Sequence, residues 1–135
     1  MLITRRIDFS ASHVCSIPNL SADENREIYG PAANPHGHNY VLEVTLEGEP
    51  DPATGMIFDL KTLKEILQRE VADPMDHRFL NHEVPPFERV VPTTENVARE
   101  IWRRLQPCFA GPVRLNNVRL WETEDLCVDY SEAPS

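Results

Sequence analysis

Apolar and polar residues alternate over two early segments of the chain. In residues 3–13 the odd positions Ile3, Ile7, Phe9 and Ala11 are apolar, interrupted by Arg5, and the even positions are polar. Residues 36–47 show the same alternation, with apolar side chains on one parity at Tyr40, Leu42, Val44 and Leu46. A period of two residues places alternate side chains on opposite faces of a β-strand. Each segment is therefore predicted to be a strand with one buried face.

Helical periodicity appears in two later segments. The first follows a short strand end expected at Met56–Phe58; it begins at Asp59, a favourable N-cap residue, and is predicted to end at Asp73–Pro74. The second opens at Thr93 and closes before Pro107. Apolar residues recur at helical spacing in both segments, at Leu60, Leu63, Leu67 and Val71 and at Val97, Ile101 and Leu105. Each helix is expected to bury one apolar stripe.

The remaining segments complete an α+β fold. Two further strands are predicted over residues 113–122 and 126–130. The segments 16–35 and 75–92 are predicted to be loops, and the first is long and polar enough to be interpreted as an active-site or interface loop. The order of elements predicts an antiparallel four-stranded sheet with two helices on one face. Residues 1–135 are expected to form a single domain, since this length is ordinary for one core.

Composition and charge narrow the possible roles. No apolar run approaches the roughly 20 residues that cross a bilayer, so no membrane contact is expected, and the first residues lack the apolar core of a secretory signal, which predicts a cytoplasmic location. Nucleic acid is not an expected partner, because 13 Lys and Arg residues stand against 22 Asp and Glu residues, for a net charge of -9.

The spacing of the cysteines indicates neither a disulfide framework nor a cysteine zinc site. These cysteines are Cys15, Cys108 and Cys127.

Three of the histidines have the spacing of a metal site. His36 and His38 are two residues apart in a predicted strand, on the parity of its apolar face, and His13 has the apolar parity of the first strand. If the two strands pair antiparallel, the end of the first lies beside the start of the second, which brings the three rings together. Three neutral imidazoles that leave an open position are typical of a catalytic zinc site. The alternative is that they are ordinary core or turn histidines.

Two acidic positions are further candidates for chemistry. Asp76 and His77 are adjacent in a proline-bounded segment and could form a proton relay, although a helix cap beside a solvated ring is the alternative. Glu122 has the parity of the covered face of its strand. A buried carboxylate needs a partner, which would be either a guanidine-like edge of a ligand or an arginine side chain.

Seven short motifs, in order along most of the chain, carry a family resemblance. They resemble the 6-pyruvoyl-tetrahydropterin synthase family, which includes the 6-carboxytetrahydropterin synthases of deazapurine biosynthesis. The motifs are Phe9–His13, Leu20–Asn25, His36–Tyr40, Pro52–Met56, Asp76–His77, Thr93–Val97 and Trp121–Thr123. The resemblance implies a tunnelling fold (T-fold), in which the sheets of a trimer join into a barrel and two trimers stack into a homohexamer with active sites at subunit interfaces.

The same resemblance implies a function and a set of site residues. It implies a zinc ion on His13, His36 and His38, and 7,8-dihydroneopterin triphosphate as the small-molecule substrate. Zinc then polarises the side-chain oxygens of the pterin while protons move and triphosphate is eliminated. By position, Glu122 would hold the 2-amino and N3 edge of the pterin, beside Thr93, Thr94 and Glu95. Asp76 and His77 would be two members of a proton-transfer triad.

The third member of that triad is missing from its two known positions. One family form has a cysteine four residues before the first histidine of the H-G-H motif, where this chain has Ala32, and a related group has a glutamate where this chain has Ala33. A methyl group cannot accept a proton. Three alternatives stay open: another residue supplies the base, the reaction is an aldol-type side-chain cleavage to a hydroxymethyl pterin, or the protein binds a pterin without converting it. The candidates for a replacement base are Cys15, Glu24 and Glu27.

Overall fold

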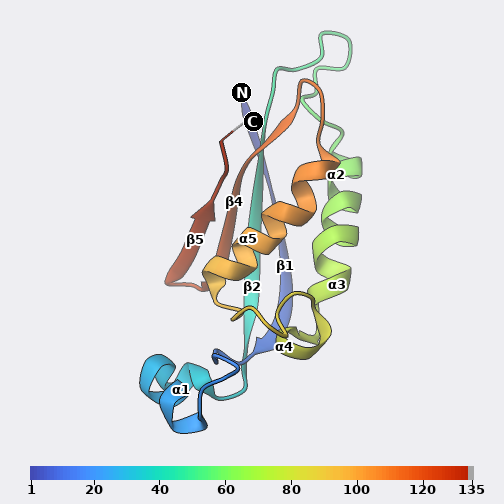
Figure 1. The fold of residues 1–135 in the computed structure, drawn as a ribbon. Coiled ribbons are helices and arrows are strands. Elements are labelled where there is room, and N and C mark those ends of the chain that lie inside the picture. The colour runs from blue at the N-terminus through green and yellow to red at the C-terminus, as the bar shows by residue number, and fades with distance from the viewer. Residues whose placement is uncertain (134–135) are drawn as a thin grey trace.

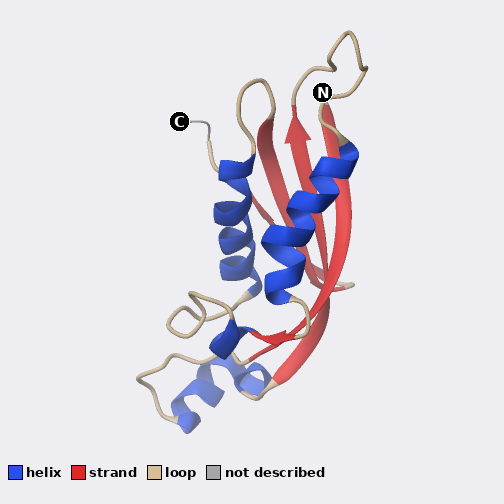
Figure 2. Cartoon of the chain, turned by 90° about the vertical axis from the view of Figure 1, so that its right-hand side faces the viewer, coloured by secondary structure: helices blue, strands red, loops and turns tan. Residues whose placement is uncertain are grey.

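The computed structural model describes residues 1–133 as an open β-sheet with helices packed on one of its faces (Figures 1 and 2). Its strands are β1 (Leu2–His13), β2 (His36–Glu47), β3 (Arg78–Phe79), β4 (Arg114–Thr123) and β5 (Leu126–Tyr130). Its α-helices are α1 (Ala22–Tyr29), α2 (Leu60–Leu67), α3 (Asp73–Met75), α4 (Leu80–Glu83) and α5 (Thr94–Leu105). The four long strands lie where the alternation predicts them, to within one residue at each end.

The sheet differs from the prediction at one edge. Its strand order is β3-β1-β2-β4-β5, and β3 pairs parallel with β1 while the other pairs are antiparallel. The α+β class and the four antiparallel strands are confirmed, but the sheet is mixed and five-stranded, so the prediction of only four strands was wrong. Two residues are too few to show an alternating pattern, so the sequence could not predict β3. The strand is defined only by the pairing of Arg78 and Phe79 with the free edge of β1. The described chain by itself forms an open sheet rather than a closed barrel.

One face of the sheet forms the hydrophobic core with α2 and α5. Figure 2 shows the sheet edge-on with both helices on the same side. The inward residues of β2 are the predicted ones, and side chains of both helices pack on them. The core residues with no exposed surface include Tyr40, Leu42, Val44, Leu46, Leu63, Leu67, Val97, Ile101 and Leu120. The opposite face carries polar side chains, such as the Thr4 and Thr45 hydroxyls that share a hydrogen bond.

Two local predictions around α2 were also wrong. Met56–Phe58 forms a bend instead of a strand end, and Ile57 and Phe58 pack against the core from it. The helix does not end at Asp73–Pro74, because a π-helical turn, Gln68–Ala72, continues α2 into α3. Pro74 stands in the first turn of α3, where a missing N–H group does not break the helix.

The segment predicted as a long loop, residues 16–35, contains α1 and a 3-10 turn, Gly30–Ala33. The Ser21 hydroxyl accepts a hydrogen bond from the Glu24 N–H, and the Glu24 carboxylate accepts one from the Ser21 N–H. This reciprocal capping box stabilises the start of α1. The helix has no apolar stripe that a search for helical periodicity would detect, since Asn25 is its one buried residue. In Figure 1, α1 lies at the lower end of the fold, below β1 and β2.

Every helix within residues 1–133 is too short or too polar to traverse a lipid bilayer.

The alternation on β2 predicts unequal effects of two neighbouring substitutions. Leu42 is fully buried, so Leu42→Ala should lower the free energy of unfolding by about 2–5 kcal/mol. Val41, on the opposite face, is half-buried, and Val41→Ala should cost about 1 kcal/mol or less. Urea unfolding at one fixed protein concentration measures both. Equal losses for the two variants would contradict the assignment of the buried face.

Candidate metal and ligand site

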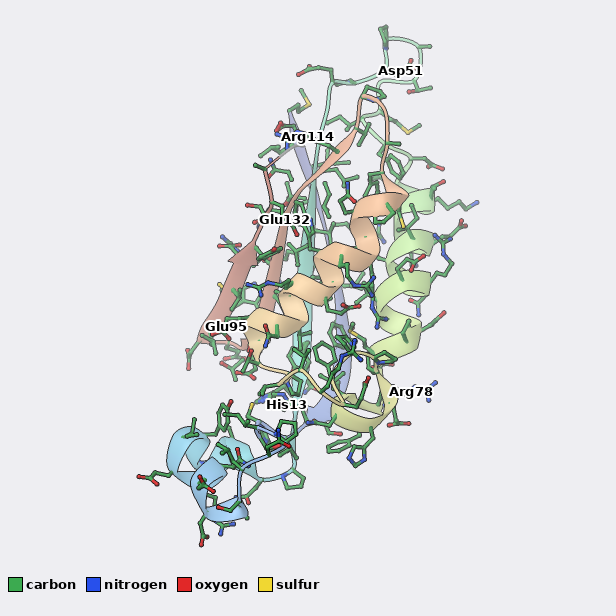
Figure 3. The ribbon with its side chains drawn as sticks, in the orientation of Figure 1. His13, Asp51, Arg78, Glu95, Arg114 and Glu132 are labelled. Atoms are coloured by element: carbon green, nitrogen blue, oxygen red, sulfur yellow. The ribbon has the colours of Figure 1, made fainter. Side chains whose placement is uncertain are left out.

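The end of β1 and the start of β2 bring three imidazole rings together. His13 pairs with His36 and Ala11 pairs with His38 in the antiparallel register. The ring centroids are 4.4 Å apart for His13 and His36, 5.1 Å for His13 and His38, and 5.0 Å for His36 and His38. One nitrogen of each ring lies within 4.8 Å of the others, so the cluster could hold a metal ion. Figure 3 labels His13 at this lower end of the fold.

Gly37 allows the strands to approach closely between the two β2 histidines. A Cβ atom at this position would lie 3.2 Å from the Ala11 carbonyl oxygen, which is tighter than ordinary packing permits. A larger residue would push β2 away from β1 at the point where the rings meet. The glycine between the two histidines therefore lets β2 lie close to β1 beside the cluster.

Backbone carbonyls orient two of the rings from behind. His13 Nδ1 donates to the Pro92 oxygen at 2.7 Å, and His36 Nδ1 donates to the Asn34 oxygen at 2.7 Å. With the proton on Nδ1, the Nε2 atom keeps its lone pair. In metal-binding histidines generally, a carbonyl that accepts from the other ring nitrogen fixes the tautomer and the direction of the ring.

The unpartnered nitrogens fit a bound cation. His13 Nε2 and His38 Nε2 are buried and have no hydrogen-bond partner among the described residues. Burial lowers the pKa of both side chains, so the rings stay neutral and able to donate a lone pair. Neutral imidazoles with free Nε2 atoms are the donors that zinc and related ions prefer. The residues present therefore fit a metal ion.

Glu122 reaches the histidine cluster from β4. Its Oε1 atom lies 3.3 Å from His38 Nε2 and 3.7 Å from His13 Nε2. The side chain faces the covered side of the sheet, as its parity predicts. Among residues 1–133 no arginine pairs with this carboxylate, so the arginine partner considered from the sequence is absent and the nearest ionisable groups are the two neutral imidazoles. The carboxylate therefore lies at the boundary between the histidine cluster and the pocket in front of it.

A pocket of about 500 Å³ opens in front of the cluster. It brings together His36, His38 and Glu122 with the N-terminal end of α5, where the Thr93 hydroxyl caps the helix by accepting from the Asn96 N–H. The full lining is Cys15, Pro31, Ala32, His36, His38, Thr93, Thr94, Glu95, Glu122 and Leu126. Sequence reasoning missed Pro31 and Leu126 as lining residues. An exposed leucine at the start of a strand gives no chemical signal by itself, and only the fold places it at the rim.

Asp76 and His77 form a pair, but on a different surface. Asp76 Oδ2 lies 2.9 Å from His77 Nδ1, and Asp76 Oδ1 accepts a hydrogen bond from the Ser10 N–H at 2.8 Å. His77 has a φ of 59°, which is uncommon for a residue with a side chain and marks a constrained backbone. The His77 side chain is 83% exposed. A preformed Asp–His pair with an accessible ring has the parts of a proton relay.

The Asp–His pair borders a second depression of about 360 Å³ rather than the pocket. Its lining includes Ser10, Ser12 and Asn39 of the uncovered sheet face, and His38 borders both hollows. In the view of Figure 3, Glu95 and Arg78 lie on opposite sides of His13. One chain therefore places the Asp76–His77 pair and the pocket on two sides of the β1–β2 ladder.

Ala32 lines the pocket and directly neighbours Cys15. The Cys15 N–H donates to the Ala32 oxygen at 2.9 Å, and Cys15 is buried with its side chain on the pocket wall. Burial raises the pKa of the Cys15 thiol, and the charges of Glu122 and Glu95 raise it further. Ala33 does not line the pocket. The two loop glutamates considered as replacement bases, Glu24 and Glu27, are exposed on α1 and are likewise outside the lining.

Comparison with known proteins identifies close relatives over nearly the whole chain. The family model described as "6-pyruvoyl tetrahydropterin synthase" matches residues 2–133. The chain is 45% identical over 130 residues to the human "6-pyruvoyl tetrahydrobiopterin synthase", covering 95% of this chain and 89% of the relative. It is 33% identical over 127 residues to the "dihydroneopterin monophosphate aldolase" of Pyrococcus furiosus, covering 94% of each chain. The solved 6-pyruvoyl tetrahydropterin synthase of Caenorhabditis elegans superposes with a TM-score of 0.91 at 38% identity, covering 98% of this chain and 96% of that one.

The Asp76 contacts predict a pH dependence of stability. The hydrogen bond from the Ser10 N–H, followed by that from His77, lowers the pKa of Asp76 below its ordinary value of 3.8. A carboxyl with a depressed folded pKa stabilises the fold above its ordinary pKa, and this contribution is lost as the pH falls through the folded value. Asp76→Asn should therefore lose less stability than the parent protein on acidification below about pH 4. Thermal unfolding from neutral to acidic pH tests this, and parallel curves would contradict it.

Proposed function

Because the chain belongs to the 6-pyruvoyl tetrahydropterin synthase family, we propose that it is a cytoplasmic zinc-dependent lyase that acts on 7,8-dihydroneopterin triphosphate or a close analogue. One observation carries the proposal. Two buried imidazole nitrogens without a hydrogen-bond partner among residues 1–133 converge with a third ring at the back of a pocket that also holds a carboxylate and a helix N-terminus. An apolar pocket with a few convergent polar groups is the usual form of a small-molecule site.

His13, His36 and His38 would hold the zinc ion. Bound zinc supplies a Lewis acid that polarises oxygen atoms of the substrate side chain. The carbonyl oxygens of Pro92 and Asn34 keep two of the rings in the required tautomer. Burial lowers the pKa of His13 and His38, so both rings are already neutral near neutral pH and need not lose a proton to bind the ion.

Glu122 and the start of α5 would bind the pterin ring. The amino-pyrimidine edge of a pterin presents two adjacent N–H donors, and a carboxylate accepts both in a bidentate pair. Thr93, Thr94 and Glu95 line the same pocket and offer further polar atoms at the ring edge. Glu122 lies between this wall and the histidines, so a ring held by Glu122 would direct its side chain toward the cluster.

Asp76 and His77 would move protons on the substrate. Asp76 holds the His77 ring through Nδ1, which leaves Nε2 on the exposed side of the ring. This pair lies on the other side of the ladder from the pocket of its own chain. We therefore include in the proposal a homo-oligomer, a dimer of trimers, in which another subunit supplies the pair to each pocket. The open sheet edges formed by β3 and β5 are available for the barrel contacts of such an assembly.

A second candidate function is aldol-type cleavage of the pterin side chain to a 6-hydroxymethyl pterin. Two observations favour it: the chain is 33% identical to an archaeal protein named dihydroneopterin monophosphate aldolase, and Ala32 lines the pocket where a cysteine base stands in one family form. In the lyase reaction, Cys15 is the replacement base that the geometry favours. Its thiol is on the pocket wall beside Ala32, whereas Glu24 and Glu27 are not in the lining.

Product analysis separates these functions. Zinc-loaded protein is incubated with 7,8-dihydroneopterin triphosphate, and pterins and triphosphate are followed by chromatography and mass spectrometry. Triphosphate release that falls about a hundredfold or more in Cys15→Ala and in His77→Ala would support the lyase with a relocated base. A hydroxymethyl pterin that persists in Cys15→Ala but not in His77→Ala would support cleavage. Binding without any product would contradict both activities and identify a pterin-binding protein.

Substitution of Glu122 tests pterin recognition separately from turnover. Glu122→Gln keeps the shape of the side chain but replaces one acceptor oxygen with a donor, so pterin affinity should fall about tenfold or more. Glu124→Gln is the matched control, because this exposed glutamate lies outside the pocket. Fluorescence titration with a pterin measures both. Equal affinities for the two variants would contradict the assigned role of Glu122.

A further inference from the structure

The free edge of β1 is held by side chains as well as by backbone. Along this edge, the Ser10 oxygen accepts from the His77 N–H at 2.6 Å, and the Ser10 N–H donates to Asp76 at 2.8 Å. The two residues of β3 then pair with Ala11 and Ser12. The segment from Asp76 to Phe79 thus runs along β1 toward the histidine cluster, and it turns away into α4 before β1 itself has ended.

Beyond β3, the side chain of Asn81 replaces a strand as the hydrogen-bonding partner along this edge. Its Oδ1 atom accepts from the Val14 N–H at 2.8 Å, and its Nδ2 group donates to the Val14 oxygen at 2.9 Å. One side-chain amide therefore satisfies both backbone groups of Val14, as a neighbouring strand would do. Asn81 is itself anchored, because the adjacent Leu80 is fully buried in the core.

Val14 directly follows the last residue of β1 and lies between two residues that reach the site. His13 precedes it and provides a buried imidazole of the cluster, and Cys15 follows it on the pocket wall. On the other side of the chain, the Cys15 N–H donates to the Ala32 oxygen. Hydrogen bonds to Asn81 on one side and to Ala32 on the other therefore hold the segment that follows β1.

We infer that Asn81 is a positioning residue for the candidate site, a role that rests on the proposed function. Its amide fixes the Val14 peptide, and this holds the His13 ring against the Pro92 oxygen and Cys15 on the pocket wall. The same bonds fix the register of the segment that carries Asp76 and His77 along β1. Asn81 touches neither the pocket nor the cluster, so it acts only through these neighbours.

The chain provides a matched control in Asn25. This buried asparagine makes the same pair of bonds to the backbone of Ile17, three residues after Val14. Its Oδ1 atom accepts from the Ile17 N–H at 2.7 Å, and its Nδ2 group donates to the Ile17 oxygen at 3.2 Å. Loss of Asn25 leaves the Ile17 N–H without its side-chain acceptor, although the Ile17 oxygen still accepts from the Leu20 N–H at 3.1 Å. Only the loss of Asn81 should disturb His13, because Ile17 lies beyond the residues that reach the site.

The experiment compares Asn81→Ala, Asn81→Asp and Asn25→Ala with the parent protein by two measurements. The first is solvent exchange of the His13 Nδ1 proton, followed by NMR of the metal-free, histidine-labelled protein. The second is zinc affinity by chelator competition, with the absorption spectrum of the Co²⁺ form as a report on ligand geometry. We expect Asn81→Ala to accelerate the exchange and to weaken zinc binding about tenfold with a changed Co²⁺ spectrum. Asn25→Ala should lower the melting temperature and change neither measurement.

The aspartate variant keeps the test decisive if the alanine variant does not fold. Asn81→Asp retains an acceptor for the Val14 N–H but loses the donor to the Val14 oxygen, so its exchange rate and zinc affinity should be intermediate. Unchanged His13 exchange in the folded Asn81 variants, or an equal change in Asn25→Ala, would overturn the inference. If the parent protein bound no zinc, the proposed function would fail, and the exchange measurement in the metal-free protein would still decide the role of Asn81.

Discussion

The antiparallel ladder between β1 and β2 determines both the core and the candidate site. Its register runs without a break from Leu2 opposite Glu47 to His13 opposite His36. Because alternate side chains share a face, this one register buries the apolar residues of both strands and turns the three histidines to the same side. A slip of one residue would move every side chain of a strand to the opposite face. The hydrophobic free energy that fixes the register of the core therefore also brings together the three imidazoles that could hold a metal ion.

The ladder brings the rings together, but other segments give them their direction. The Pro92 carbonyl, just before α5, holds His13, and the Asn34 carbonyl, just before β2, holds His36. The free Nε2 atoms of His13 and His38 lower the stability of the fold. A buried polar atom without a hydrogen-bond partner reduces the free energy of unfolding by about 1–3 kcal/mol. The large core beneath the site tolerates this cost, and the unpartnered atoms stay available to a ligand. Functional sites commonly carry such locally unfavourable groups.

The same end of β1 positions two different groups of polar side chains on two sides. The histidine cluster and the pocket lie on the covered side, while the Asp76–His77 pair is attached to the free edge through Ser10. His77 keeps a backbone conformation with positive φ, which the surrounding hydrogen bonds must maintain. A single strand thus sets the positions of both groups, and under the proposed function a second subunit would bring such a pair to each pocket.

The sequence by itself determined the four long strands, the main helices α2 and α5, the convergence of His13, His36 and His38, and the direction of Glu122. These features follow from residue spacing, since a period of two or of 3.6 assigns each side chain to a face before any contact is known. The sequence did not reveal β3, α1, the separation of the Asp76–His77 pair from the pocket, or Leu126 at its rim. Periodic patterns cannot show these features, because β3 exists only through its pairing with the edge of β1, and α1 buries a polar residue instead of an apolar stripe. Pocket walls depend on residues from distant segments, and only tertiary packing decides which of them meet.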